Sequence, residues 1–235
     1  MTVGHATLRV KFEAMKFPTL TALLVLGTAI ANAADQPAAA KPEAEKEIVL
    51  FNGKSLDDWE SVDVGGSGVV ELEGGLMIIN QGENVSGAIY KKAAALPTTN
   101  YEITLEAKRM QGVDFFVGLT FPVGDVKHCA TLICGGWGGS VTGISCIDSM
   151  DASDNNTSSY QRYKDDEWYA IKLRVTPKNL SVWLGDKQII DEDIEGKKIS
   201  VRPGPIESYL PLSLTTFNTM AAIRNIKLTP IPETK

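Results

Sequence analysis

The sequence predicts an all-β domain built as a two-sheet antiparallel β-sandwich, or jelly roll. From Glu47 onward, short apolar runs alternate with polar residues at a period of two, and Gly, Pro, Asn and Asp separate the runs. Apart from the short segment 91–95, no part of this region sustains an apolar stripe at helical spacing over three turns. No internal repeat of roughly 20 to 50 residues is present, which argues against a propeller or a solenoid.

The alternation is clearest in two predicted strands. In 101–108 the odd positions carry apolar side chains and the even positions polar ones, so one face of the strand is expected in the core and the other in water. Segment 169–176 alternates in the same way, and turn residues at 177–179 and 185–186 predict two hairpins after it. The predicted strands, in chain order, are 48–51, 69–72, 76–79, 87–91, 101–108, 115–121, 129–134, 142–147, 169–176, 179–184, 187–191, 210–216 and 221–230.

Residues 1–33 have the composition of a secretory signal peptide. Lys11 and Lys16 precede an apolar run over 20–30, and Ala-Asn-Ala, which ends at Ala33, is a signal-peptidase site. The apolar run is too short to cross a bilayer as a stable helix. We therefore expect cleavage near Ala33 and export to the periplasm or the extracellular space.

The rest of the chain divides into a linker, one domain and a tail. Segment 34–46 is rich in Ala, Pro, Glu and Lys and poor in bulky apolar residues, which predicts a disordered linker. The sandwich domain is predicted over 47–231, a length that suits one hydrophobic core, and a short tail follows at 232–235.

The charge of the chain limits its partners. The full chain has a net charge of −6, and without residues 1–33 it would keep 20 basic and 28 acidic residues, a net charge of −8. An acidic protein without a basic stripe in its sequence repels phosphate backbones and anionic lipid surfaces. We therefore expect no nucleic-acid partner and no membrane insertion, while the oligomeric state stays open.

Three cysteines lie close together in the sequence, at Cys129, Cys134 and Cys146. An odd number leaves a free thiol or an intermolecular bond, and at most one disulfide can form within the chain. Their spacing is not that of a zinc site, which favours packing in the core.

Several segments are similar to motifs of one known family. Segment 49–59, Val-Leu-Phe-Asn-Gly-Lys-Ser-Leu-Asp-Asp-Trp, resembles the opening motif LFNGKDLSGW of the 3-keto-disaccharide hydrolase family. Further similar segments follow in the family's order at 71–76, 101–108, 167–173, 182–187 and 223–228. The resemblance covers 48–231. It implies a concanavalin A-like sandwich that cleaves glycosidic bonds, in glycosides or in their forms oxidised at C3.

The central part of the chain departs from the family pattern. Where the family has NSGiffR, this chain has Val-Asp-Phe-Phe-Val-Gly-Leu at 113–119. Where the family has yEvQilD, this chain has Thr-Gly-Ile-Ser-Cys-Ile-Asp at 142–148, so only Asp148 matches and the acidic residue of that motif is missing.

Three residues are candidate catalytic groups. Asp114 and Asp148 are carboxylates in the divergent region, and His128 is the one histidine left after removal of residues 1–33. Glycosidic cleavage needs two facing carboxylates, or a base and a stabilising charge when a C3 ketone acidifies the neighbouring C–H bond. The alternatives are a surface ion pair for the carboxylates and an exposed loop position for the histidine. The catalytic hypothesis requires these side chains to converge.

Asp148, Asp151 and Asp154 are candidate metal ligands. They lie in an acidic loop, 148–156, whose carboxylate and amide oxygens suit a divalent cation such as calcium. The spacing is not that of an EF-hand, and the alternative is a solvated loop built from residues that favour turns.

Trp137, Arg109 and Arg162 are candidate ligand-binding residues for a carbohydrate partner. Trp137 lies among four glycines, where an indole ring either stacks on a pyranose or closes one end of the sandwich. The arginines suit hydroxyl or carboxylate recognition, or surface ion pairs. The other tryptophans, Trp59, Trp168 and Trp183, are predicted in the core. The competing functions are thus a glycoside hydrolase or lyase and a lectin-like module without catalysis.

Overall fold

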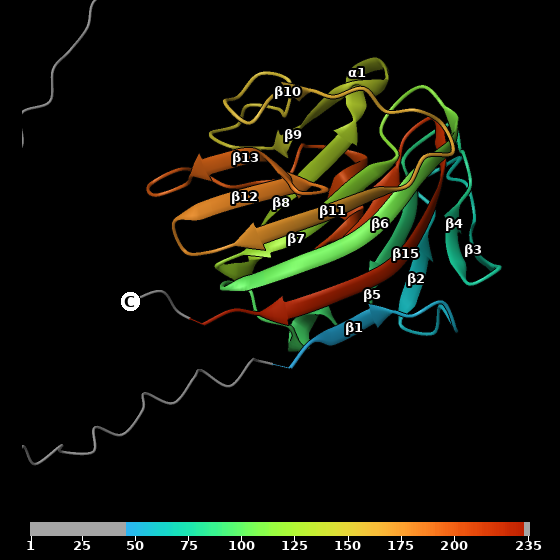
Figure 1. Cartoon of the computed structure of the whole chain (residues 1–235), viewed down its shortest axis with the longest axis horizontal. Helices are drawn as coiled ribbons and strands as arrows, with labels where there is room; N and C mark the ends of the chain where they lie inside the picture. The colour runs from blue at the N-terminus through green and yellow to red at the C-terminus, as the bar shows by residue number, and fades with distance from the viewer. Residues whose placement is uncertain (1–45, 233–235) are drawn as a thin grey trace, which may run out of the picture. The chain divides into compact units, whose positions relative to one another are not determined.

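A computed structural model of the protein describes residues 46–232, which form two antiparallel β-sheets packed face to face (Figure 1). The first sheet contains, in spatial order, β13 (Lys187–Asp193), β12 (Asn179–Leu184), β11 (Tyr169–Val175), β6 (Tyr101–Gly112), β15 (Thr219–Pro230), β4 (Leu76–Ile79) and β3 (Val70–Glu73), with β1 (Ile48–Phe51) also paired to β15. The second sheet contains β10 (Ser159–Tyr160), β9 (Val141–Ser145), β8 (Asp125–Gly135), β7 (Val117–Val123), β14 (Ser213–Thr216), β5 (Ser86–Tyr90) and β2 (Trp59–Val62). The predicted all-β sandwich is confirmed.

Helical structure in residues 46–232 is limited to three short segments: η1 (Ala93–Ala95), α1 (Gly136–Gly139) and η2 (Pro205–Tyr209). None of the helices in this part of the chain is long and apolar enough to cross a membrane.

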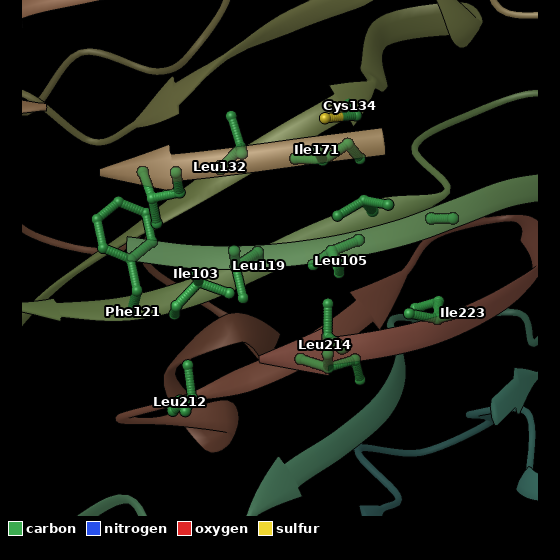
Figure 2. Packing of buried hydrophobic residues seen from close by; sticks show 14 of the residues in the cluster. Ile103, Leu105, Leu119, Phe121, Leu132, Cys134, Ile171, Leu212, Leu214 and Ile223 are labelled. Atoms are coloured by element: carbon green, nitrogen blue, oxygen red, sulfur yellow. The ribbon is translucent and has the colours of Figure 1, made fainter. Parts of the chain in front are cut away.

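The inner faces of the two sheets supply the main hydrophobic core. Ile103 and Leu105 on β6 and Ile223 on β15 pack in one cluster with Leu119 on β7 and Leu214 on β14 (Figure 2). Each of these five side chains is at most 2% exposed. The alternation in the sequence is therefore the cause of the layering, because the apolar side of each strand can leave water only against the other sheet.

Tyr101 connects the two layers at one end of the core. Its ring is buried on β6, and its hydroxyl donates a hydrogen bond of 2.6 Å to the carbonyl oxygen of Pro122 on β7 in the opposite sheet. Burial raises the pKa of this hydroxyl well above its usual value, so it remains a donor.

A second, smaller apolar cluster lies on the outer face of the second sheet. Ile206 and Tyr209 of η2 pack with Val85 at the start of β5. Ile89 joins them from β5, where its two neighbours face the main core instead. The Tyr209 hydroxyl donates to the carbonyl oxygens of Val62 and Val85 at 3.0 and 3.1 Å. The connection between β13 and β14 is thereby fixed across this face, where it forms one wall of the candidate site.

The predicted strands are present with shifted ends, but two short edge strands were missed. β10 has only two residues, and β2 runs through Glu60 and Ser61, so neither shows an alternating pattern long enough to detect. β8 begins at Asp125, which places His128 in a strand instead of the expected loop. Residues 1–45 and 233–235, which include the predicted leader, almost all of the linker and most of the tail, lie outside the described residues.

Three tryptophans were predicted in the core, and the prediction is wrong for two of them. Trp59 is 6% exposed and belongs to the core, as expected. Trp168 and Trp183 are half-buried, and each ring has a cationic side chain over it, Arg224 at 4.0 Å from Trp168 and Lys172 at 4.0 Å from Trp183. A large ring beneath a cation can remain at a wet sheet face because the cation shields it from water.

Replacing Leu105 tests the burial of this core. The Leu105→Ala variant should lose about 2–5 kcal/mol of unfolding free energy, because the removed methyl groups leave a cavity between the sheets. Leu72→Ala on β3 is the matched control, since Leu72 is 40% exposed and its truncation should cost less than about 1 kcal/mol. Urea unfolding of both variants measures the difference. Equal losses would contradict the assignment of Leu105 to the core.

Candidate functional site

A cavity of about 480 Å³ opens on the outer face of the second sheet. Its floor includes Thr131 and Ile133 of β8, which alternate with the core residues Ala130, Leu132 and Cys134 and therefore face away from the core. The remaining lining comes from six chain segments and consists of Asn84, Val85, Asp114, Phe115, Trp137, Ser145, Arg202, Pro203, Pro205, Ile206 and Phe217.

Trp137 stands at the rim of this cavity on a glycine-rich turn. Its backbone is in the left-handed region, with φ 49° and ψ 54°, and the side chain is 40% exposed. Gly138 and Gly139 continue the turn with φ values of +85° and +98°. The φ of Gly139 is one that residues with a side chain rarely adopt, and a Cβ atom there would lie 2.9 Å from Nη1 of Arg109. Strain of this kind in a bulky residue is often maintained at functional sites.

Asp114 connects the β6–β7 loop with the tryptophan turn. Its Oδ1 accepts a hydrogen bond of 2.8 Å from the amide of Phe115, and its Oδ2 accepts one of 3.3 Å from the amide of Gly138. Thr219 holds the backbone of Asp114 from both sides, because its Oγ1 accepts from the Asp114 amide at 3.1 Å and donates to the Asp114 carbonyl at 2.9 Å. The carboxylate is thus held in a fixed position in the cavity wall.

Arg202 brings a positive charge to the same cavity. Its guanidinium lies over the Trp137 ring, 5.9 Å from the centroid, and its Nε lies 3.5 Å from Oδ2 of Asp151. The other oxygen of Asp151 accepts a hydrogen bond of 3.3 Å from the thiol of Cys146. Arg202 is therefore oriented by an acidic residue on one side and an indole on the other.

Part of the cavity lining is apolar. Phe115 and Phe217 stack with their ring centroids 6.1 Å apart and their planes 25° apart. With Val85 and Ile206 they form the apolar part of the lining. An apolar concave surface with a few fixed polar groups is typical of small-molecule and sugar sites.

The structure does not bring the three predicted catalytic residues together. Asp114 lines the cavity, but His128 lies at the other end of β8, six residues before Cys134, which corresponds to roughly 20 Å along the strand. Its Nδ1 is 2.8 Å from Oδ2 of Asp125 and its side chain is exposed. Asp148 does not line the cavity either, since it is exposed and its Oδ1 accepts a hydrogen bond from the amide of Lys198. A joint catalytic role for the three residues is therefore not supported.

The predicted calcium ligands also do not form a cluster. No group of three or more His, Cys, Asp or Glu side chains that could hold a metal ion is found in residues 46–232. Asp148 accepts a hydrogen bond from the backbone amide of Lys198, Asp151 pairs with Arg202, and Asp154 accepts a hydrogen bond from the Ser153 hydroxyl. The loop is instead closed by Asn155, which donates to backbone carbonyls of Ile144 and Met150. This arrangement is that of a turn-rich loop.

The predicted ligand-binding residues divide between two neighbouring depressions. Trp137 lines the cavity, whereas Arg109 and Arg162 line a shallower depression of about 440 Å³ on the other side of Gly138 and Gly139. Arg109 is already bound to Asp165 at 2.6 Å and to the Tyr163 carbonyl at 2.9 Å, which fixes it in the wall.

Sequence reasoning missed Arg202, Asn84 and Phe217. Each is far in sequence from Asp114 and Trp137 and lies in no recognisable motif. Only the fixed path of the β13–β14 connection brings Arg202 to Trp137.

The three cysteines are free and buried. Burial raises the pKa of the Cys129 thiol to about 11 and that of the Cys134 thiol to about 12. The pKa of Cys146 rises to about 12, first through burial and second through its hydrogen bond to Asp151. All three thiols therefore remain neutral at physiological pH, which suits packing in the fold and not nucleophilic chemistry.

The family model described as the 3-keto-alpha-glucoside-1,2-lyase-like domain matches residues 46–229. The chain belongs to this family. The membership agrees with the sequence resemblance and supports a glycan-related function for the domain. No curated protein sequence matches the chain.

Solved structures share the sandwich at low sequence identity. A protein from Parabacteroides distasonis ATCC 8503 with a provisional glycosyl hydrolase assignment is 12% identical, with a TM-score of 0.51 over 79% of this chain and 94% of its own. The transglycosylase Crh5, without ligand, is 8% identical, with a TM-score of 0.55 over 81% of this chain and 85% of its own. Identities this low establish a common fold and not a common activity.

The raised thiol pKa values predict a loss of stability at alkaline pH. Unfolded thiols ionise near pH 8.5, whereas the folded thiols hold their protons to about pH 11–12, so folding favours the neutral form. The contribution of the buried thiols to the unfolding free energy is complete below about pH 8. It decreases as the pH rises from there toward the pKa values of the thiols in the folded protein. Urea unfolding should give a lower free energy at pH 10 than at pH 8. The fall should be shallower for Cys129→Ala, and equal slopes for both proteins would contradict this cause.

Proposed function

We propose that the cavity binds a glycoside oxidised at C3 and that Asp114 starts the cleavage of its glycosidic bond by elimination. The observation that carries this proposal is the convergence of one carboxylate, one guanidinium and one exposed indole, from Asp114, Arg202 and Trp137, on a single cavity. Membership of the 3-keto-alpha-glucoside-1,2-lyase-like family supports it.

The lining suits a pyranose ring. The C–H face of a sugar stacks on an indole, and its hydroxyl groups need fixed donors and acceptors. Trp137 offers the ring, Arg202 and Asn84 offer donors, and Asp114 offers an acceptor. The volume of about 480 Å³ lies within the range of small-molecule sites.

The elimination needs one base, which matches the one acidic side chain that lines the cavity within residues 46–232. A ketone at C3 acidifies the C2–H bond, and Asp114 takes that proton. The electron pair of the C2–H bond becomes the C1–C2 double bond as the C1–O bond breaks. The leaving oxygen then takes the proton from the carboxylic acid of Asp114. The products are an unsaturated 3-keto sugar and the free alcohol, so atoms and charges balance.

Arg202 is placed to stabilise the charge that develops in this step. Proton removal moves negative charge onto the C3 oxygen, and a fixed cation in a partly enclosed site lowers the energy of that state. Asp151 on one side and Trp137 on the other limit the movement of the guanidinium. Its orientation therefore requires little reorganisation during the reaction.

A second function, carbohydrate binding without catalysis, is favoured by the hydrogen bonds of Asp114. Both of its carboxylate oxygens accept hydrogen bonds from backbone N–H groups, so the side chain already acts as a structural link between the β6–β7 loop and the tryptophan turn. Inverting and retaining glycosidases use a pair of carboxylates, and a second one does not line this cavity within the described residues.

The activity is tested with p-nitrophenyl 3-keto-α-glucoside and with the unoxidised glucoside. Release of nitrophenol is expected from the keto substrate alone. Asp114→Asn should reduce the rate by about 100- to 10,000-fold, the usual contribution of a general base, while the variant still binds the parent glucoside. His128→Gln is the control, because His128 lies outside the cavity, and its rate should equal that of the unmodified protein.

Two results would decide against catalysis by Asp114. If Asp114→Asn releases nitrophenol at the unmodified rate, the base lies elsewhere. Nitrophenol release is also measured in the presence of a chelator and in the presence of added calcium. If none is released under either condition, but the protein binds the glucoside and Trp137→Ala does not, the protein is a carbohydrate-binding module.

We also propose that the protein is exported, on the basis of the signal-peptide pattern in residues 1–33. Expression of the full chain in a bacterial host followed by fractionation should give a periplasmic protein whose first residue is Ala34, as determined by N-terminal sequencing. An uncleaved protein retained in the cytoplasm would contradict export.

A further inference from the structure

The outer face of the first sheet contains a groove of about 500 Å³, on the side of the sandwich opposite the cavity. β11, β6 and β15 lie side by side there, and two rows of outward residues cross them. Lys172 and Lys227 both pair with Thr104, and Ala170 and Arg224 both pair with Glu106. The groove lies over these rows and is bounded by Gly185 and Asn225.

Small residues keep the groove open. The outward positions of β11 alternate as Trp168, Ala170, Lys172 and Arg174, so Ala170 leaves a gap between larger side chains. Gly185 lies beside this gap, where its backbone amide donates a hydrogen bond of 2.8 Å to the Ala170 carbonyl. Because it has no side chain, it does not fill the gap. Two short residues at the same place produce the depression.

A β-bulge directs polar groups into the groove. The pairing of β15 with β6 shifts between Arg224 and Lys227, and Asn225 takes a left-handed φ of 54°. The bulge turns Asn225 outward, where its amide donates to Oε1 of Glu106 at 2.8 Å, while Arg224 binds Oε2 at 2.6 Å. Bulges often redirect side chains near binding sites.

Two tryptophans on the outer face of the same sheet lie beneath cationic side chains at the groove, although neither ring lines it. Lys172 lies over the ring of Trp183, and Arg224 lies over the ring of Trp168, each at 4.0 Å. Trp183 pairs with Lys172 on the neighbouring strand, and Trp168 lies four residues before Lys172 in the sequence.

The charge of the groove is positive although the whole chain is acidic. Both carboxylate oxygens of Glu106 are engaged by Arg224 and Asn225, which hold its pKa below the usual value. Lys172 forms no ion pair within residues 46–232, whereas Lys227 pairs with Glu47 at 3.0 Å. Lys172 and Lys227 both line the groove, on the strands on either side of Thr104.

We infer that this groove is a second carbohydrate site, separate from the cavity, and that its ligand is a saccharide chain with carboxylate groups. The lysines pair with carboxylates, and Asn225 and Thr104 bind hydroxyl groups. This inference does not depend on catalysis in the cavity.

The test is calorimetric titration of the full chain with a hexamer of α-1,4-linked galacturonate and with maltohexaose, which is neutral. The acidic hexamer should bind, and the affinity should fall as salt rises from 0.05 to 0.5 M, because the charges are exposed. Ala170→Leu fills the floor and Lys172→Gln removes a cation, and each should weaken binding at least tenfold. Lys178→Gln is the matched control, since it removes an exposed lysine elsewhere and should leave the affinity unchanged.

Asp114→Asn and Trp137→Ala separate the two sites, because both should bind the acidic hexamer as the unmodified protein does. Equal binding of maltohexaose, unmodified affinity in Ala170→Leu and Lys172→Gln, or a loss confined to Trp137→Ala would overturn the inference. No binding of the acidic hexamer would overturn it as well. Thermal unfolding of each variant confirms that it is folded, which is expected because Ala170 is exposed on the outer face of its strand.

Discussion

The burial of one face of the central strands between the two sheets is the constraint on which the rest of this molecule depends. Leu105 on β6 and Leu119 on β7 leave water only because the sheets are packed together. Each strand thereby commits alternate residues to the core, and only its other residues and the loops remain for function. This is why Thr131 and Ile133 reach the cavity while Leu132 between them does not.

The position of the site depends on long-range contacts between loops. Asp114 follows β6, Trp137 follows β8, and Arg202 lies after β13, so three separate connections meet over β8 and β9. Asp114 holds the tryptophan turn through Gly138, and Tyr209 fixes the connection that carries Arg202. The rigid sandwich makes these contacts reproducible, because loops placed by a packed scaffold can carry functional groups in fixed positions.

The sequence predicts the fold well because local chemistry determines it. The alternation in 101–108 and the turn at 185–186 act within a few residues, and the strands are found where these patterns place them. The site was predicted only in part. Asp114 and Trp137 were identified from their residue types, but the grouping with His128 and Asp148 assumed that neighbours in a divergent segment converge. The β7–β8 hairpin instead places Asp114 and His128 at opposite ends of the strand pair.

The tryptophans show the same limit in another way. Trp168 and Trp183 were expected in the core because large apolar residues are usually buried. The alternation of β11 already indicated otherwise, since Trp168 has the same parity as the outward residues Lys172 and Arg174. Parity along a strand is therefore a better guide to a residue's face than its hydrophobicity. The consequence is functional, because indoles and cations on the outer face of the first sheet are what distinguish the groove from an ordinary ion-pair surface. Since the groove and the cavity lie on opposite sheets, one short sugar cannot occupy both, and joint binding requires a long or branched chain.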